Sequence, residues 1–148
     1  MKIIHNKLLP LGNYKLMNIL GLVFSKAPIG KITLSEKRHE QYHTIQQYEL
    51  LMTGLTIGLI LSNINDSWWY MLCAILFPFA MYVLGWIAEI ALPPYHNAKS
   101  MQKLFSDAYR DNCFEREAYA NEDNPDYFVT RPIYGMFRYI LKKKDRKG

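Results

Sequence analysis

The feature that most restricts the fold is an apolar run from Trp68 to Leu92. It holds 25 residues and one charged side chain, Glu89, close to its end. As an α-helix it would be about 37 Å long at ~1.5 Å per residue, more than the ~30 Å of a bilayer core. Pro78 would bend this helix without excluding it, because membrane helices tolerate proline. The run therefore predicts a transmembrane helix rather than the buried helix of a soluble core.

A second apolar stretch, Leu50–Ile64, precedes the first and is less decisive. Its clean apolar part is about a dozen residues, below the ~20 that usually span a bilayer. A polar turn, Ser62–Ser67, separates the two stretches. We expect the pair to form a helical hairpin in the membrane. The alternative is that 50–64 lies in the interface beside a single span.

Charge predicts the orientation of this hairpin. Its two outer flanks carry basic residues and the loop 62–67 carries none. By the positive-inside rule, both termini are then cytoplasmic, as in an integral protein of a bacterial inner membrane. The formal charge is +5, but residues 131–148 hold seven basic residues against one acidic residue, so the rest is almost neutral. This distribution does not favour a nucleic-acid partner; the lipid bilayer is the expected one.

The remaining sequence fits a single domain that is mainly α-helical. A β-rich segment is expected over 1–34, in which 15–24 pairs with 31–34 as a hairpin. A helix follows over 35–64, with Ser35 as its N-cap. A further helix is expected over 97–123, ended by Asn124-Pro125-Asp126, and then a basic tail over 131–148 that is helical over 131–141.

The motif that indicates chemistry is His39-Glu40-Gln41-Tyr42-His43, an H-E-x-x-H pattern. Positions i and i+4 share one face of a helix, so His39 and His43 can present two imidazoles to one metal ion. Zinc lowers the pKa of its bound water towards ~7, and Glu40 beside it could accept the proton as general base. The pattern therefore predicts Zn²⁺ as the cofactor.

Residues 114–122 form a glutamate-dense segment downstream. Together with the H-E-x-x-H motif, it resembles the gluzincins, zinc metallopeptidases whose third ligand is a glutamate on a later helix. In that family a polar residue four places further on supports a histidine ligand. The resemblance implies Glu117 as third ligand with Asn121 in the supporting role. Glu115 is the alternative; the two glutamates lie about 200° apart on a helix and cannot both face one metal.

The resemblance is greatest to the membrane-embedded gluzincins. In those members the zinc-binding helix leads into a transmembrane segment. Combined with the elements predicted above, the expected fold is a membrane hairpin with a zincin-like H-E-x-x-H helix, a short N-terminal β-hairpin and a C-terminal helix with the glutamate. The resemblance implies a metallopeptidase that acts on a peptide or protein. The predicted topology places its site at the cytoplasmic interface, because two crossings return both ligand helices to one face. Tyr119, Tyr109 and His96 are candidate partners for the oxyanion. The alternative function is a non-catalytic membrane scaffold or assembly factor, with a structural metal or none.

Overall fold

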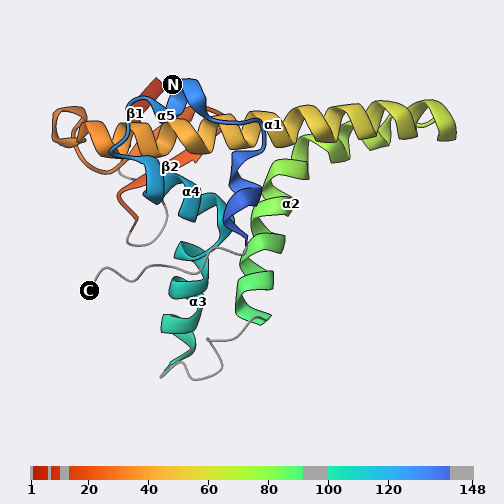
Figure 1. Cartoon of the computed structure of the whole chain (residues 1–148). Helices are drawn as coiled ribbons and strands as arrows, with labels where there is room; N and C mark the ends of the chain where they lie inside the picture. Colours follow the sequence, from red (N-terminus) through yellow and green to blue (C-terminus); the bar gives the residue numbers. More distant parts are fainter. Residues whose placement is uncertain (1, 7, 11–13, 92–99, 141–148) are drawn as a thin grey trace.

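The computed structural model describes residues 2–6, 8–10, 14–91 and 100–140, and most of these residues are helical. A single long helix, α1, is the axis on which the other elements are arranged (Figure 1). In chain order the elements are β1 (Lys2–His5), β2 (Leu16–Ile19), β3 (Leu22–Ser25), the 3-10 turn η1 (Ile29–Lys31), α1 (Leu34–Asn65), α2 (Trp69–Ala91), α3 (Met101–Arg110), α4 (Cys113–Asn121), α5 (Tyr127–Thr130) and the 3-10 turn η3 (Gly135–Tyr139).

Helix α1 is 32 residues long and joins the H-E-x-x-H motif to the second apolar stretch without a break, as expected. It begins two residues before the predicted start. Thr33 rather than Ser35 is the N-cap, because its side chain accepts from the Glu36 amide while the Glu36 carboxylate accepts from the Thr33 amide. This reciprocal pairing satisfies two amides that the first turn leaves free. The helix ends at Asn65, and the backbone of the C-cap residue Asp66 has the left-handed conformation.

The N-terminal segment forms a three-stranded sheet in the order β1-β3-β2, with β1 parallel and β2 antiparallel to β3. The expected partner at 31–34 is wrong. The hairpin instead folds within 16–25, where Leu20 and Gly21 both have positive φ and allow a two-residue turn. The sheet lies along the first half of α1, fastened by Gln47, whose side chain donates to the Asn18 carbonyl at 3.1 Å.

Helix α2 runs back along the second half of α1, as the hairpin prediction requires. Gly54 and Gly58 allow the close approach: a Cβ on Gly54 would lie 2.7 Å from the Ala74 carbonyl oxygen, and one on Gly58 2.8 Å from that of Tyr70. Small residues four apart bring helices together in this way in membranes. Pro78 lies inside α2, and Figure 1 shows the helix bending about half-way along and leaving α1.

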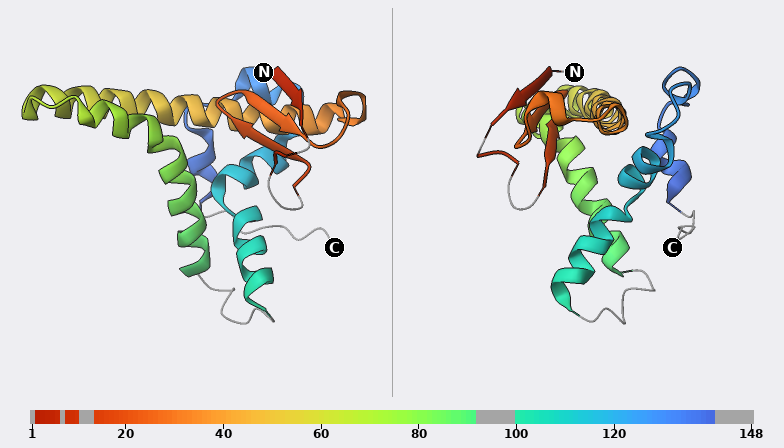
Figure 2. Two further views of the ribbon diagram at one scale, coloured as in Figure 1. Left: turned by 180° about the vertical axis from the view of Figure 1, so that it is seen from behind. Right: turned by 90° about the vertical axis from the view of Figure 1, so that its left-hand side faces the viewer.

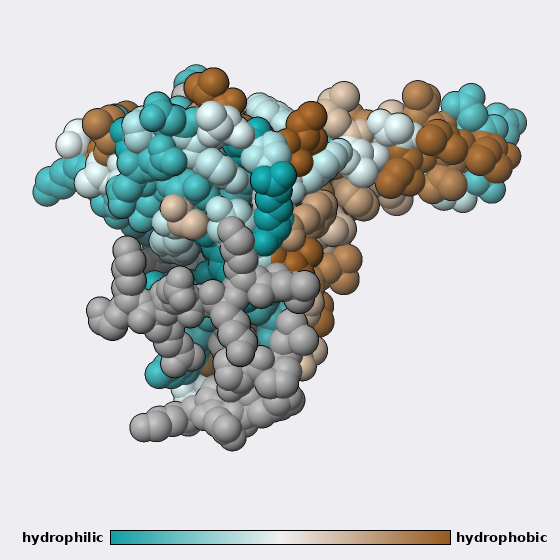
Figure 3. Space-filling view, in the orientation of Figure 1, coloured by the Kyte–Doolittle hydropathy of each residue, from teal (hydrophilic) through white to brown (hydrophobic). Residues whose placement is uncertain are grey.

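The second half of α1 and the helix α2 together form an arm. This arm projects from the rest of the molecule (Figure 2) and carries much apolar surface (Figure 3). Ile60, Ile64, Trp69, Leu76 and Leu84 are each more than half exposed. Within the described ranges, one helix, α2, is long and apolar enough to cross a membrane. The structure thus shows an apolar helical pair, whereas a hairpin with two spans stays a prediction.

The expected helix over 97–123 is two helices. Residues 97–99 lie outside the described residues; α3 ends at Arg110, and Asn112 caps α4 by accepting from the Glu115 amide at 2.9 Å. Asn124-Pro125-Asp126 follows α4, as predicted. The expected helix over 131–141 is wrong for its described part, 131–140: Pro132 and Gly135 are poor helix formers, and a 3-10 turn forms instead.

A small core joins these elements beneath α1. Leu50, Cys113, Phe114 and Met136 are buried together, and side chains of α2 and η3 pack against them. The Phe114 ring stacks on Tyr82 of α2, with centroids 4.2 Å apart. This packing fixes α4 against both α1 and α2, and so determines which α4 side chains can reach the histidines.

Candidate metal centre

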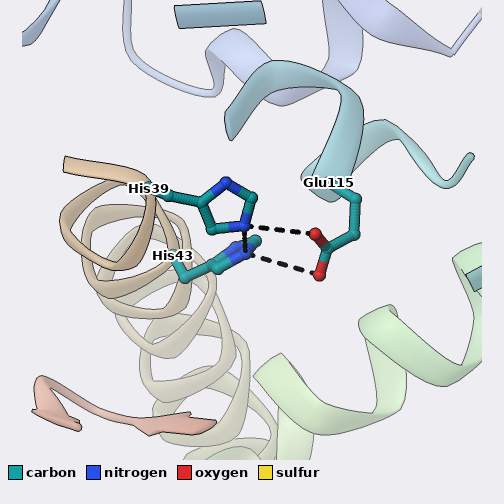
Figure 4. A group of neighbouring side chains, drawn as sticks. All are labelled: His39, His43 and Glu115. Atoms are coloured by element: carbon teal, nitrogen blue, oxygen red, sulfur yellow. Dashed lines mark hydrogen bonds and ion pairs between the residues drawn. The ribbon is translucent and has the colours of Figure 1, made fainter. Parts of the chain in front are cut away.

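The two motif histidines face each other on α1, as the spacing predicts. His39 and His43 are one turn apart, and their Nε2 atoms are 3.0 Å from each other. Both rings are largely buried, at 9% and 6% exposure. The Nε2 atoms of the two histidines therefore face the same point beside the helix (Figure 4).

Glu115 of α4 completes the group. Its carboxylate lies opposite the histidines, with Oε2 3.3 Å from His39 Nε2 and Oε1 3.4 Å from His43 Nε2 (Figure 4). Its position follows from the cap: Asn112 begins α4, and Glu115 in the first turn is directed at α1. His39, His43 and Glu115 form a group that could hold a metal ion.

The spacing of these donor atoms suits a small tetrahedral cation. With metal–ligand bonds of about 2.0–2.1 Å, two ligands of a tetrahedral zinc ion lie about 3.3 Å apart. The two Nε2 atoms are 3.0 Å apart, and they lie 3.3 and 3.4 Å from the two different oxygens of the Glu115 carboxylate. Two imidazoles and one carboxylate are also a ligand set that zinc uses in hydrolases. The donor set could therefore hold a divalent metal ion, and its chemistry fits Zn²⁺.

The preference for Glu117 as third ligand is not supported, because the structure places this side chain elsewhere. Glu117 is fully buried on the other side of α4, where Arg131 binds both of its oxygens at 2.8 and 3.1 Å and Tyr127 donates at 2.9 Å. Residues two apart on a helix point in nearly opposite directions, so α4 can turn only one of the two glutamates to the histidines. That residue is Glu115, the alternative.

Asn121 does not support a histidine either. Its amide donates to the Glu117 carbonyl and to the Tyr139 hydroxyl. The next residue, Glu122, takes that place: its carboxylate lies 2.9 Å from His39 Nδ1. A carboxylate there favours the tautomer with hydrogen on Nδ1, which leaves the Nε2 lone pair for a metal. The resemblance did not point to Glu122, because this residue lies five places after Glu117 rather than four.

His43 has different partners, also not found from sequence. Its Nδ1 lies 2.9 Å from Gln46 Oε1 and 2.8 Å from the Tyr82 hydroxyl. Gln46 is three residues after His43 on the same helix, a spacing that could have suggested a contact. Tyr82 comes from α2, and only the tertiary fold brings it here.

The charges around the centre are strongly coupled. Burial alone would lower the pKa of His43, but the facing Glu115 carboxylate outweighs burial and raises that pKa to about 9. Burial alone would raise the pKa of Glu115, yet His43 and His39 hold it well below its usual range. Burial also raises the pKa of Glu40, despite the opposing effect of both histidines. The site thus concentrates carboxyl groups around two imidazoles, an arrangement that a divalent cation would stabilise.

Two of the three candidate oxyanion partners lie at the centre. The Tyr109 hydroxyl is hydrogen-bonded to Glu115, and burial raises its pKa. The Tyr119 ring meets the His39 ring edge-on, with centroids 4.5 Å apart, and Tyr119 is 47% exposed. The third, His96, lies outside the described residues.

Comparisons of the chain with models of protein families, with curated proteins and with solved structures found no match.

Proposed function

We propose that this protein is a membrane-associated zinc hydrolase that cleaves peptide bonds. The observation that carries the proposal is the convergence of His39, His43 and Glu115 from two separate helices at separations suited to one metal ion. A buried glutamate, Glu40, is adjacent to the first of these ligands in the chain. A purely structural metal site needs no such acid or base.

Each residue has a distinct role in this proposal. His39, His43 and Glu115 hold the metal, and Glu40 accepts a proton from the attacking water and transfers it to the leaving amine. When bound, zinc supplies Lewis-acid chemistry that lowers the pKa of water to about 7 and polarises a carbonyl. Tyr119 and Tyr109 are the candidate hydroxyl donors to the oxyanion, and a peptide or protein is the expected substrate.

The arm places the reaction at a lipid bilayer in this proposal. Residues 50–92 contain no lysine or arginine, and the exposed side chains of α1 and α2 in the arm are largely apolar. Trp68 and Trp69 stack at the turn between the helices, with centroids 4.6 Å apart and both rings more than half exposed. Tryptophan is enriched at membrane interfaces. The arm enters the bilayer from the cytoplasmic side, and the metal centre stays at that interface.

The test is metal content followed by one substitution. The full-length protein, purified in detergent without a nickel column, should contain about one zinc per chain. Glu40→Gln should keep that zinc and reduce peptide hydrolysis by about 10²–10⁴-fold, the range for a lost general base. Absence of stoichiometric metal would refute the proposal. Bound zinc without any hydrolysis that depends on Glu40 would favour the non-catalytic scaffold with a structural metal.

A further inference from the structure

A second buried polar cluster lies directly behind the metal centre and takes no part in holding metal. Arg131 is its centre: its guanidinium binds Glu117 through Nε at 2.8 Å and Glu49 through both terminal nitrogens at 2.6 and 3.0 Å. The Arg131 side chain is 3% exposed and that of Glu117 is not exposed. Burying a second carboxylate with one arginine is costly unless the remaining lone pairs of the carboxylates are satisfied by further hydrogen bonds.

Gln46 connects this cluster to the metal centre. Its amide nitrogen donates to Glu117 Oε2 at 2.8 Å and to the Phe114 carbonyl at 3.0 Å. Its amide oxygen accepts from the Tyr82 hydroxyl at 2.8 Å and faces His43 Nδ1 at 2.9 Å. Gln46 is completely buried, and every hydrogen-bonding direction of its amide is occupied.

These contacts fix the direction of the amide. Turning it over would set its oxygen against the Glu117 carboxylate and the Phe114 carbonyl, two acceptors, and would turn its NH₂ towards His43. In the observed direction, the oxygen requires a hydrogen on His43 Nδ1. The lone pair of His43 is then on Nε2, where it faces His39 and Glu115.

We infer that Gln46 is a positioning residue for the metal ligand His43, and that the Glu117–Arg131 pair holds Gln46 in its working orientation. The inference rests on the proposed metal site. It also gives Glu117, the residue that resembled a ligand, a role one step removed from the metal. Substitution of a residue that orients a metal-binding histidine typically weakens metal binding by about 10–100-fold.

The chain supplies a matched control next to Gln46. Gln47 is also buried on α1 and makes two hydrogen bonds, but these bind the Asn18 carbonyl and the Leu20 amide on the sheet side. Zinc affinity of the full-length protein is measured by competition with a chromophoric chelator, together with thermal unfolding of the metal-free form. Gln46→Ala should weaken zinc binding about 10–100-fold, while Gln47→Ala leaves it within a few-fold of wild type.

The Co²⁺-substituted protein gives a readout that a loss of stability does not change. The ligand-field absorption bands of Co²⁺ depend on ligand geometry, so Gln46→Ala should alter them and Gln47→Ala should not. If Gln46→Ala does not fold, Tyr82→Phe removes only the hydroxyl shared by Gln46 and His43. This variant should show the same spectral change in weaker form. Tyr42→Phe is the control, because its buried hydroxyl donates to the Asn121 and Asn124 carbonyls and not to His43.

A double-mutant comparison tests whether Glu117 affects zinc binding through its contact with Gln46. Glu117→Ala should weaken zinc binding in the wild type and have little further effect once Gln46 is alanine, because both act through the same contact. Equal losses in both backgrounds, or equal effects of Gln46→Ala and Gln47→Ala, would overturn the inference and leave the metal site intact. A wild-type protein that binds no metal would overturn the proposed function and this inference with it.

Discussion

Glu115 and Glu117 are two residues apart on one short helix, yet their carboxylates have opposite surroundings. Glu115 faces two imidazoles, while Glu117 faces a guanidinium that it shares with Glu49. The difference is set by direction: α4 turns by about 200° between them. Each carboxylate is compensated by a different partner, so the two are not interchangeable.

The first prediction at this scale concerns the third ligand. Glu115→Ala removes a direct ligand of the metal. It should therefore weaken zinc binding more than the loss of a supporting residue does, which is about 10–100-fold. The measurement is zinc content after dialysis, with the Co²⁺ spectrum as a second readout. Glu122→Ala serves as comparison, since it removes only the partner of His39 Nδ1 and should cause the smaller loss. A Glu115→Ala protein with full zinc content would remove Glu115 from the ligand set.

Proton competition gives the second prediction. In the metal-free protein the Glu115 carboxylate raises the pKa of His43 to about 9, so at neutral pH this ring is the imidazolium, with a proton on both nitrogens. Zinc must displace that proton, and its apparent affinity should rise by up to about tenfold per pH unit until pH about 9, then level off. Titrations at several pH values between about 6 and 10 measure the slope. An affinity independent of pH over this range would contradict the coupling between His43 and Glu115.

At the scale of elements, the close contact between α1 and α2 is the feature most sensitive to substitution. Gly58 approaches the backbone of α2, where an added Cβ would lie 2.8 Å from the Tyr70 carbonyl oxygen and 2.9 Å from Ala74 Cβ. Neither neighbour is the flexible end of a long side chain. The helices would have to separate to admit even one methyl group.

Gly58→Ala should therefore destabilise the protein by about 1–3 kcal/mol, although alanine is the better helix former by about 1 kcal/mol. Gly30→Ala is the control, because a Cβ there meets nothing within 4 Å. Denaturant or thermal unfolding in detergent compares the two variants with wild type. A Gly58→Ala protein as stable as wild type would show that the two helices do not approach as closely as described.

At the scale of the whole molecule, the position of the metal centre relative to the membrane is the open prediction. His39 and Glu115 precede and follow the apolar pair in the chain, yet their side chains lie 3.3 Å apart. This proximity is compatible with an arm that enters and leaves by the same side. It is not compatible with a single straight crossing between the two ligands, which would separate them by ~30 Å of hydrocarbon.

Single-cysteine labelling tests this topology in inverted and right-side-out vesicles. In a background in which the exposed Cys73 is replaced by serine, Lys31→Cys should react from the cytoplasmic side and Asn65→Cys from the opposite side. Both positions are exposed, so access to reagent depends on the membrane alone. Reaction of both from the same side would show that the arm does not cross, and residues 50–64 would then lie in the interface.

Local patterns predicted the elements that depend on neighbours in the chain. The H-E-x-x-H spacing, the continuous helix into Leu50–Leu61, the apolar helix and the break at 124–126 all match the structure. The β-hairpin partner at 31–34 and the helix over 131–140 were wrong. In both cases a local alternative prevailed: a two-residue turn at Leu20-Gly21 in the first, and Pro132 with Gly135 in the second.

The sequence by itself determined that two histidines and a glutamate share one turn of a helix that leads into an apolar pair. It did not determine which carboxylate of α4 faces the two histidines. Nor did it determine that Glu122, Gln46 and Tyr82 contact the Nδ1 atoms of these histidines. Helical periodicity fixes directions only relative to a helix's own axis. The rotation of α4 about that axis was decided by the packing of Phe114 on Tyr82 and by the pairing of Glu117 with Arg131, contacts between residues far apart in the chain.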